Sequence, residues 1–234
     1  MPAKTFVLVH GAWHGGWCWR RVADLLADKG HKVYTPTLTG LADRSHLMSD
    51  SIGLATHVAD IVNLMKWERL TDVVLVGHSY AGFVISAVAE EVPIASIVFL
   101  DAFLPESGQC LVEITAPATR DAIEAARRSG AIAVPPRPAA FFKVNEADQA
   151  WVDAMCTPHP IATMVERVTL AGARERIARK TYVRAKSYAN PAFDRALGEL
   201  RSDSSWRTHE VASGHDVMVD EPERLTEILL EATQ

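Results

Sequence analysis

Short, unbroken apolar runs alternate with helical patterns along most of the chain, and this alternation restricts the fold more than any other feature. The runs are TFVLV, HKVYT, DVVLV and ASIVFLD in the first half, with KTYVRAKSY and THEVAS near the end. Strands that are apolar on both faces must be covered on both faces. The helical segments between them supply that cover, so the pattern predicts an α/β fold with a mostly parallel sheet.

The segment between residues 103 and 180 departs from this alternation. Its helical stretches are short, they are interrupted by VPPRP and TPHP, and no strand pattern is evident. Proline ends helices and is disfavoured in central strands, which favours a group of short helices here. We therefore predict one domain over residues 1–234, with residues 103–180 inserted into it as a small helical cap.

The charge and the cysteine spacing exclude several classes of partner and location. The net charge of −5 provides no basic surface for nucleic acid or for an anionic membrane. No apolar run has the length of a membrane span or the pattern of a signal peptide. Cys18, Cys110 and Cys156 are widely spaced, which favours reduced thiols in the cytoplasm. We expect a small molecule as the partner, and a homodimer is compatible with the sequence.

The segment GHSYAG, residues 77–82, is the strongest candidate for chemistry. It follows the run DVVLV and precedes a helical pattern, so Ser79 lies at the tip of a strand–turn–helix unit. This arrangement is typical of a nucleophile elbow, whose usual pattern is G-x-S-x-G. Ala81 occupies the last position of that pattern here, and Gly82 follows it. The alternative is a structural serine in a glycine-containing turn.

The glycine-rich segment VHGAWHGGW, which follows the first strand, is a candidate source of hydrogen-bond donors. Acyl transfer needs donors aimed at the oxygen that becomes negative, and backbone amides serve this purpose. We expect the amides of Ala12 and Tyr80 to form this oxyanion hole. The alternatives are a loop that only permits tight packing and a zinc site at His10 and His14, for which no cysteine or carboxylate completes the ligand set.

His215 is the candidate general base among the nine histidines. It lies in SGHDVMVDEP, between the last strand and the closing helix, and the chain order serine, acid, histidine is typical of enzymes with a nucleophile elbow. Two acids compete for the third role. Asp101 ends the fourth strand, beside the strand that leads to Ser79, whereas Asp194 lies beyond the usual position after the fifth strand. The position favours Asp101, with a structural aspartate as its alternative role.

The remaining histidines and the aromatic residues are interpreted by position. Five histidines are expected to be surface or packing residues: His31, His46, His57, His159 and His209. Four side chains are expected to line a small apolar pocket: Trp13, Phe103, Trp151 and Met155. Tyr80, Phe141 and Phe142 are further candidates, and core packing is the alternative for the cap residues. Because no basic cluster marks a site for an anion, a small, neutral, largely apolar ester is the expected substrate.

Together these segments resemble the α/β-hydrolase superfamily, in the branch of plant methylesterases, hydroxynitrile lyases, and bacterial pyrethroid and carbendazim esterases. The resemblance is carried by FVLVHGAWHGGWCW, PTLTGLADRSH, VVLVGHSYAG, FLDAFLPESGQ and GHDVMVDEP and covers nearly the whole chain. It implies an α/β-hydrolase fold and a carboxylesterase-type serine hydrolase that acts through an acyl-enzyme and needs no metal or other cofactor.

Two alternatives to hydrolysis stay open within this resemblance. The lyases of the branch carry a threonine and a lysine where this chain has Gly11 and Asp216, which disfavours lyase chemistry. A non-catalytic ligand-binding scaffold of the same fold is the second alternative, and the presence of Ser79 and His215 does not exclude it.

Overall fold

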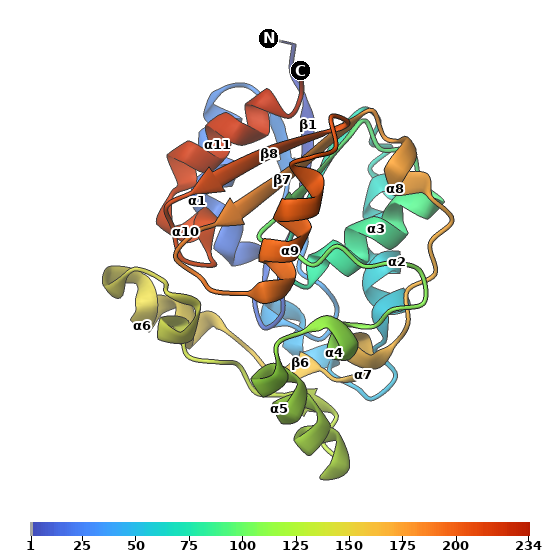
Figure 1. The fold of residues 1–234 in the computed structure, drawn as a ribbon, viewed down its shortest axis with the longest axis vertical. Helices are drawn as coiled ribbons and strands as arrows, with labels where there is room; N and C mark the ends of the chain where they lie inside the picture. Colours follow the sequence, from blue (N-terminus) through green and yellow to red (C-terminus); the bar gives the residue numbers. More distant parts are fainter. Residues whose placement is uncertain (1) are drawn as a thin grey trace.

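The computed structural model describes residues 2–234 and contains one six-stranded sheet (Figure 1). The strands are β1 (Thr5–Val9), β2 (Lys32–Tyr34), β3 (Val73–His78), β4 (Ser96–Leu100), β7 (Arg179–Ala185) and β8 (Trp206–Val211). Their order across the sheet is β2-β1-β3-β4-β7-β8, and each strand runs parallel to its neighbours. The predicted α/β fold with a mostly parallel sheet is confirmed.

Helices cover both faces of this sheet, which explains why β3 and β4 are buried over their whole length (Figure 1). One face carries α1 (Arg20–Asp28) and α11 (Pro222–Glu231), and the other carries α2 (Leu54–Trp67), α3 (Ala81–Glu91) and α9 (Pro191–Leu200). The shorter elements beside the sheet are η1 (Gly16–Trp19), η2 (Ala42–Leu47), α8 (Ala173–Arg176) and α10 (Val217–Asp220). Every helix within residues 2–234 is too short or too polar to cross a bilayer.

Most of the segment between β4 and β7 forms a separate layer beyond the sheet (Figure 1). Its elements are α4 (Leu111–Ile114), α5 (Pro117–Arg128), β5 (Ala133–Val134), η3 (Ala139–Phe142), α6 (Glu146–Met155), β6 (His159–Pro160) and α7 (Ala162–Val165). The prediction of a cap without strands is wrong, because β5 and β6 pair as a short antiparallel ribbon. Strands of two residues are too short to show a period in the sequence.

The turns after four strands converge at the carboxyl edge of the sheet. Register brings these strand ends level: Val9 pairs with Gly77, His78 with Leu100, and Leu100 with Val183. The segments that follow β1, β3, β4 and β8 carry Ala12, Ser79, Asp101 and His215. The cap layer lies against this same edge (Figure 1). The edge therefore brings together residues that are far apart in the sequence.

Candidate active site

Ser79 lies in the sharp turn between β3 and α3. Its φ of 55° is in the left-handed region, which residues other than glycine rarely adopt. Three backbone hydrogen bonds hold this turn. The Ser79 amide donates to the carbonyl of Leu100 (3.2 Å), and the Ser79 carbonyl accepts from the amides of Gly82 (3.1 Å) and Phe103 (3.2 Å). Strained backbone of this kind persists where surrounding contacts enforce it, and it is common at functional sites.

Two glycines beside Ser79 are required by close packing. A Cβ atom at Gly82 would lie 1.9 Å from the carbonyl oxygen of Phe103, so this position, one residue after the usual one, must be glycine. A Cβ atom at Gly11 would lie 2.9 Å from Cβ of Ser79 and 2.8 Å from Nδ1 of His78. The loop after β1 therefore touches the turn that carries Ser79, and a threonine at residue 11 would force that turn to shift.

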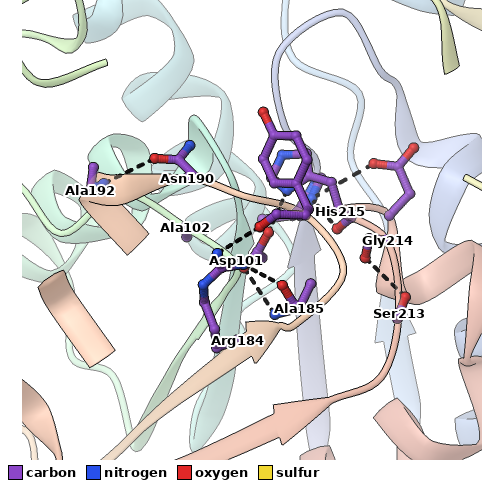
Figure 2. Close-up of polar contacts among 12 residues, drawn as sticks. Asp101, Ala102, Arg184, Ala185, Asn190, Ala192, Ser213, Gly214 and His215 are labelled. Carbon is purple, nitrogen blue, oxygen red and sulfur yellow. Dashed lines mark hydrogen bonds and ion pairs between the residues drawn. The ribbon is translucent and has the colours of Figure 1, made fainter. Parts of the chain in front are cut away.

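Asp101 and His215 meet at the carboxyl edge of the sheet (Figure 2). Oδ2 of Asp101 lies 2.6 Å from Nδ1 of His215, and both residues are buried. The other carboxylate oxygen accepts hydrogen bonds from Nη1 of Arg184 (2.7 Å) and from the amide of Ala185 (3.0 Å). A neutral imidazole bonded to a carboxylate in this way carries its proton on Nδ1. Nε2 of His215 is then left with a lone pair that can accept a proton.

The rival acid, Asp194, is engaged elsewhere. It lies on α9, its side chain is 62% exposed, and its carboxylate pairs with Nη2 of Arg184 at 2.8 Å. The structure thus brings Asp101, and not Asp194, to His215. Asp101 has a φ of 41°, a second strained residue at this edge. No sequence pattern predicts this role for Arg184, which lies within the strand β7.

Asp216 forms a second buried pair with His14, beside the first. Oδ2 of Asp216 lies 2.9 Å from Nε2 of His14, and Nδ1 of His14 lies 2.8 Å from the carbonyl oxygen of Ala12. Burial disfavours the charged form of His14, but the Asp216 carboxylate outweighs this and raises the pKa of His14. A His14 that donates to both oxygens is an imidazolium, so the position after His215 carries an anion that is already paired.

The alternative of a zinc site at His10 and His14 finds no support in their contacts. His14 pairs with Asp216, while the two ring nitrogens of His10 contact the carbonyl of Gly11 (2.8 Å) and the amide of Leu38 (3.0 Å). Over the part of the chain that the structure describes, no group of three His, Cys, Asp or Glu side chains is arranged to hold a metal ion.

The pocket beside Ser79 is a cavity of about 40 Å³, which has room for a few water-sized groups. Ala12, Tyr80 and His215 line it together with Ser79. Seven aromatic side chains surround it: Trp13, Tyr80, Phe103, Phe141, Phe142, Tyr188 and Phe193. Thr115, Thr119 and Asn190 add neutral polar groups. Within residues 2–234 the amides of Ala12 and Tyr80 donate to no other group, so both remain available to a ligand.

Two residues that were predicted to line the pocket lie outside it. The ring of Trp151 packs edge-on against Trp17 at 5.0 Å, and Met155 lines a different, open groove that includes Trp17. The reason is the placement of α6, which an ion pair between Arg21 and Asp148 (2.7 Å) ties to α1. Trp151 therefore faces Trp17 of η1 and Arg21 of α1 instead of Ser79. Trp13 and Phe103 line the pocket as expected.

Sequence reasoning missed several residues that the pocket contains. Tyr188 and Phe193 place their rings 4.5 Å and 5.7 Å from the imidazole of His215, and Asn190 lies between them in the chain. The position of Tyr188 and Asn190, just after a strand that ends at the carboxyl edge, is a signal that could have identified them. Thr115 directly follows α4 and Thr119 lies on α5 of the cap, and their sequence context carries no such signal.

Comparison with known proteins places this geometry in context. Residues 6–228 match the alpha/beta hydrolase family. The chain is 39% identical to a carbendazim hydrolyzing esterase of Nocardioides sp. (strain SG-4G), over 96% of this chain and 98% of that protein. An extracellular alpha/beta-hydrolase from a Paenibacillus species superimposes with a TM-score of 0.86 at 26% identity, over 98% of each chain. A pyrethroid hydrolase from Sphingobium faniae has the same fold, with a TM-score of 0.76 at 20% identity, over 99% of this chain and 97% of that one.

Proposed function

The chain belongs to the alpha/beta hydrolase family and is an esterase-type hydrolase, and we propose that it cleaves a small, neutral, largely apolar carboxylic ester through an acyl-enzyme. The observation that carries this proposal is the 2.6 Å contact between Asp101 and His215 at the pocket that also contains Ser79. A nucleophile, a base and an acid that orients the base are the groups that acyl transfer requires.

Each residue has a defined part in the proposed reaction. The hydroxyl oxygen of Ser79 attacks the ester carbonyl carbon, and Nε2 of His215 takes the hydroxyl proton. Asp101 accepts the Nδ1 proton in a hydrogen bond and stabilises the imidazolium. The amides of Ala12 and Tyr80 stabilise the carbonyl oxygen as it becomes negative. The imidazolium protonates the leaving alcohol, and His215 then activates the water that releases the acid and regenerates Ser79.

The pocket lining supports a neutral substrate of limited size. Apart from His215, none of the described residues that line the pocket is ionisable near neutral pH, and most of the lining is aromatic or aliphatic. A charged substrate would lose its hydration there without gaining a partner of opposite charge. The Nocardioides relative is a carbendazim hydrolyzing esterase, and we extend only the ester-hydrolysing chemistry to this chain.

Hydrolysis is favoured over lyase chemistry by the residue that follows His215. In the lyases a lysine at this position provides a cation, whereas Asp216 provides a carboxylate that His14 already neutralises. Gly11 adds to this argument, because the loop there lies against Ser79 and has no room for a larger side chain.

A fluorophosphonate probe tests the proposal together with turnover of 4-nitrophenyl acetate. The wild-type protein should be labelled and active. Ser79→Ala should remain unlabelled and lose about 10⁴-fold or more of its activity, with a comparable loss in His215→Ala, because these groups act as a unit. Ser129→Ala, at an exposed helix end, is the matched control and should behave as wild type. Retained activity in Ser79→Ala would reject the proposal, and a wild-type protein that is neither labelled nor active would favour a ligand-binding scaffold.

We further propose a cytoplasmic enzyme that needs no metal or organic cofactor. Cys18, Cys110 and Cys156 are unpaired thiols, as is usual in a reducing compartment. Turnover in excess chelator should equal turnover without it. Activity that disappears in chelator and returns with zinc would contradict the proposal.

A further inference from the structure

Trp13 is a strained residue that the cap holds at three points. It follows Ala12 directly and has a φ of 67°, in the left-handed region. Its carbonyl accepts from the amide of Thr157 (2.9 Å), and its indole Nε1 donates to the carbonyl of Val134 (3.0 Å). Its amide donates to Nδ1 of His159 (3.3 Å). The loop after β1 is thus tied to the β5–β6 ribbon, more than a hundred residues later in the chain.

The neighbours of His159 determine which of its nitrogens carries the proton. The Thr163 hydroxyl donates its proton to the carbonyl of Pro160 (2.8 Å), so its oxygen must accept from Nε2–H of His159 (2.8 Å). Nδ1 then has the lone pair that the Trp13 amide needs. Burial, reinforced by the nearby His57, keeps the pKa of His159 well below its usual range, so the side chain stays neutral and remains an acceptor.

We propose that His159 is a positioning residue for the oxyanion hole. By holding the Trp13 amide it orients the Ala12–Trp13 peptide plane, and this restrains the backbone of Ala12, whose own amide belongs to the preceding Gly11–Ala12 peptide. Its ring also contacts the ring of Tyr80, with centroids 4.8 Å apart, so one side chain supports both residues that supply amides to the hole. The inference rests on the proposed function, because it assigns the oxyanion to the amides of Ala12 and Tyr80.

A positioning role and a purely structural role lead to different kinetics. If His159 only packs the cap, its replacement should lower stability and weaken all ligands alike. If it aims the Ala12 amide, replacement should affect the transition state and leave ground-state binding nearly unchanged, because the amide is needed only when the oxygen becomes negative.

The test compares two ketones of nearly the same shape as inhibitors of 4-nitrophenyl acetate hydrolysis. 2,2,2-Trifluoroacetophenone readily forms a hemiketal with a serine, which places a negative oxygen in the hole, whereas acetophenone binds largely as the ketone. His159→Phe keeps an aromatic ring and loses the acceptor. It should lower kcat by about 10²-fold, the effect expected when a catalytic group is displaced by about 1 Å, with KM nearly unchanged. It should weaken the trifluoroketone by a similar factor and leave acetophenone unaffected.

A pair of amide variants gives a second, independent measurement. His159→Asn places an oxygen near the position of Nδ1, whereas His159→Gln places its amide near the position of Nε2. We expect the Asn variant to recover most of the activity that the Phe variant loses, and the Gln variant to recover little. Equal activity of the Asn and Gln variants would overturn the inference, and this comparison stands even if the Phe variant does not fold.

Val152→Ala controls for loss of cap stability, since Val152 is buried on α6. It should lower the melting temperature without changing the ratio of the two inhibition constants. An equal weakening of both ketones in His159→Phe, or no change in either, would overturn the role of His159. Activity that does not depend on Ser79 would reject the proposed function, so the two failures are distinguishable.

Discussion

Arg184 and Asp101 form a buried ion pair, with Nη1 of the arginine 2.7 Å from Oδ1 of the aspartate (Figure 2). The guanidinium also pairs with Asp194 on its other side, at 2.8 Å. A carboxylate with no exposed surface needs a nearby cation and hydrogen-bond donors to remain ionised. Arg184 meets this need and leaves Oδ2 of Asp101 free to face His215. The two acids that compete for one role in the sequence are thus held by the same arginine, and only one of them reaches the histidine.

Replacing the two acids separately tests this arrangement. Asp101→Asn keeps the size of the side chain but can no longer enforce the required tautomer of His215. Turnover should fall by up to about 10⁴-fold, as the corresponding change does in a serine protease. Asp194→Asn should stay close to wild type, because Asp194 is largely exposed. Steady-state kinetics on one ester, with melting temperatures for both variants, makes the comparison. A slow Asp194→Asn beside a normal Asp101→Asn would reassign the acid.

The closeness of Gly11 to the Ser79 turn leads to a second prediction. A methyl group at Gly11 would lie 2.9 Å from Cβ of Ser79, so Gly11→Ala must displace one of them. We expect kcat to fall by roughly 10- to 100-fold, because a shift of about 1 Å at the nucleophile is enough for such a loss. The free energy of unfolding should fall by about 1–3 kcal/mol from overpacking.

Gly198→Ala is the matched control for that variant. Gly198 is exposed within α9, and a Cβ there would meet nothing within 4 Å. This change should leave kcat unaltered and raise stability by roughly 0.5–1 kcal/mol, since alanine is the better helix former. If Gly11→Ala were as active as Gly198→Ala, the contact between the loop and the turn would have no catalytic importance.

Specificity should depend on Phe141 and not on Trp151. Phe141 lines the pocket and is 41% exposed, whereas Trp151 packs against Trp17 outside the pocket. Phe141→Ala should therefore raise the kcat/KM for 4-nitrophenyl hexanoate relative to the acetate. Trp151→Ala should lower the melting temperature and leave that ratio unchanged. A larger change of the ratio in Trp151→Ala would mean that α6 contacts the acyl group after all.

Buried neutral histidines predict a loss of stability in acid. Burial lowers the pKa of His57 to about 4 and that of His10 to about 3. Burial also holds the pKa values of His78 and His159 well below their usual range. The unfolded chain binds these protons near pH 6.5, but the folded chain does not. The contribution of these histidines to stability is therefore fully present above pH 6.5. Below pH 6.5 the free energy of unfolding falls, by up to about 1.4 kcal/mol per pH unit for each histidine.

His14 acts in the opposite sense, which separates its contribution from the others. Burial alone would lower the pKa of His14, but the Asp216 carboxylate raises it. The stabilisation from this pair is therefore present below pH 6.5 and is lost as the pH rises through the raised pKa. Urea unfolding between pH 4 and pH 8 measures the slope. His57→Gln should reduce the slope of the unfolding free energy against pH in acid by the contribution of one bound proton. His46→Gln, at an exposed position, should leave this slope unchanged. An acid slope of zero in the wild-type protein would contradict the prediction.

The sequence by itself determined those features that depend on local pattern. The run TFVLV has the same bounds as β1, and the apolar residues of LATHVADIVNLMKW repeat with the period of a helix over the length of α2. The apolar period alone sets these elements, because it requires one or both faces to be buried. The turn of Ser79 and the loop of His215 were predictable for the same reason, since a strand, a turn and a helix follow one another directly in the chain.

The tertiary structure decided what depends on which elements meet. Position in the sequence favours Asp101 over Asp194, but the contact with His215 depends on how β4, β7 and α9 are placed around Arg184. The same holds for Trp151, whose helical spacing predicts burial but not the neighbour against which it is buried. The sequence predicts a surface or packing residue at His159, yet this side chain bonds to Trp13 across 146 positions of sequence. An apolar period shows that a side chain leaves water, and only the packing of distant segments determines what it contacts there.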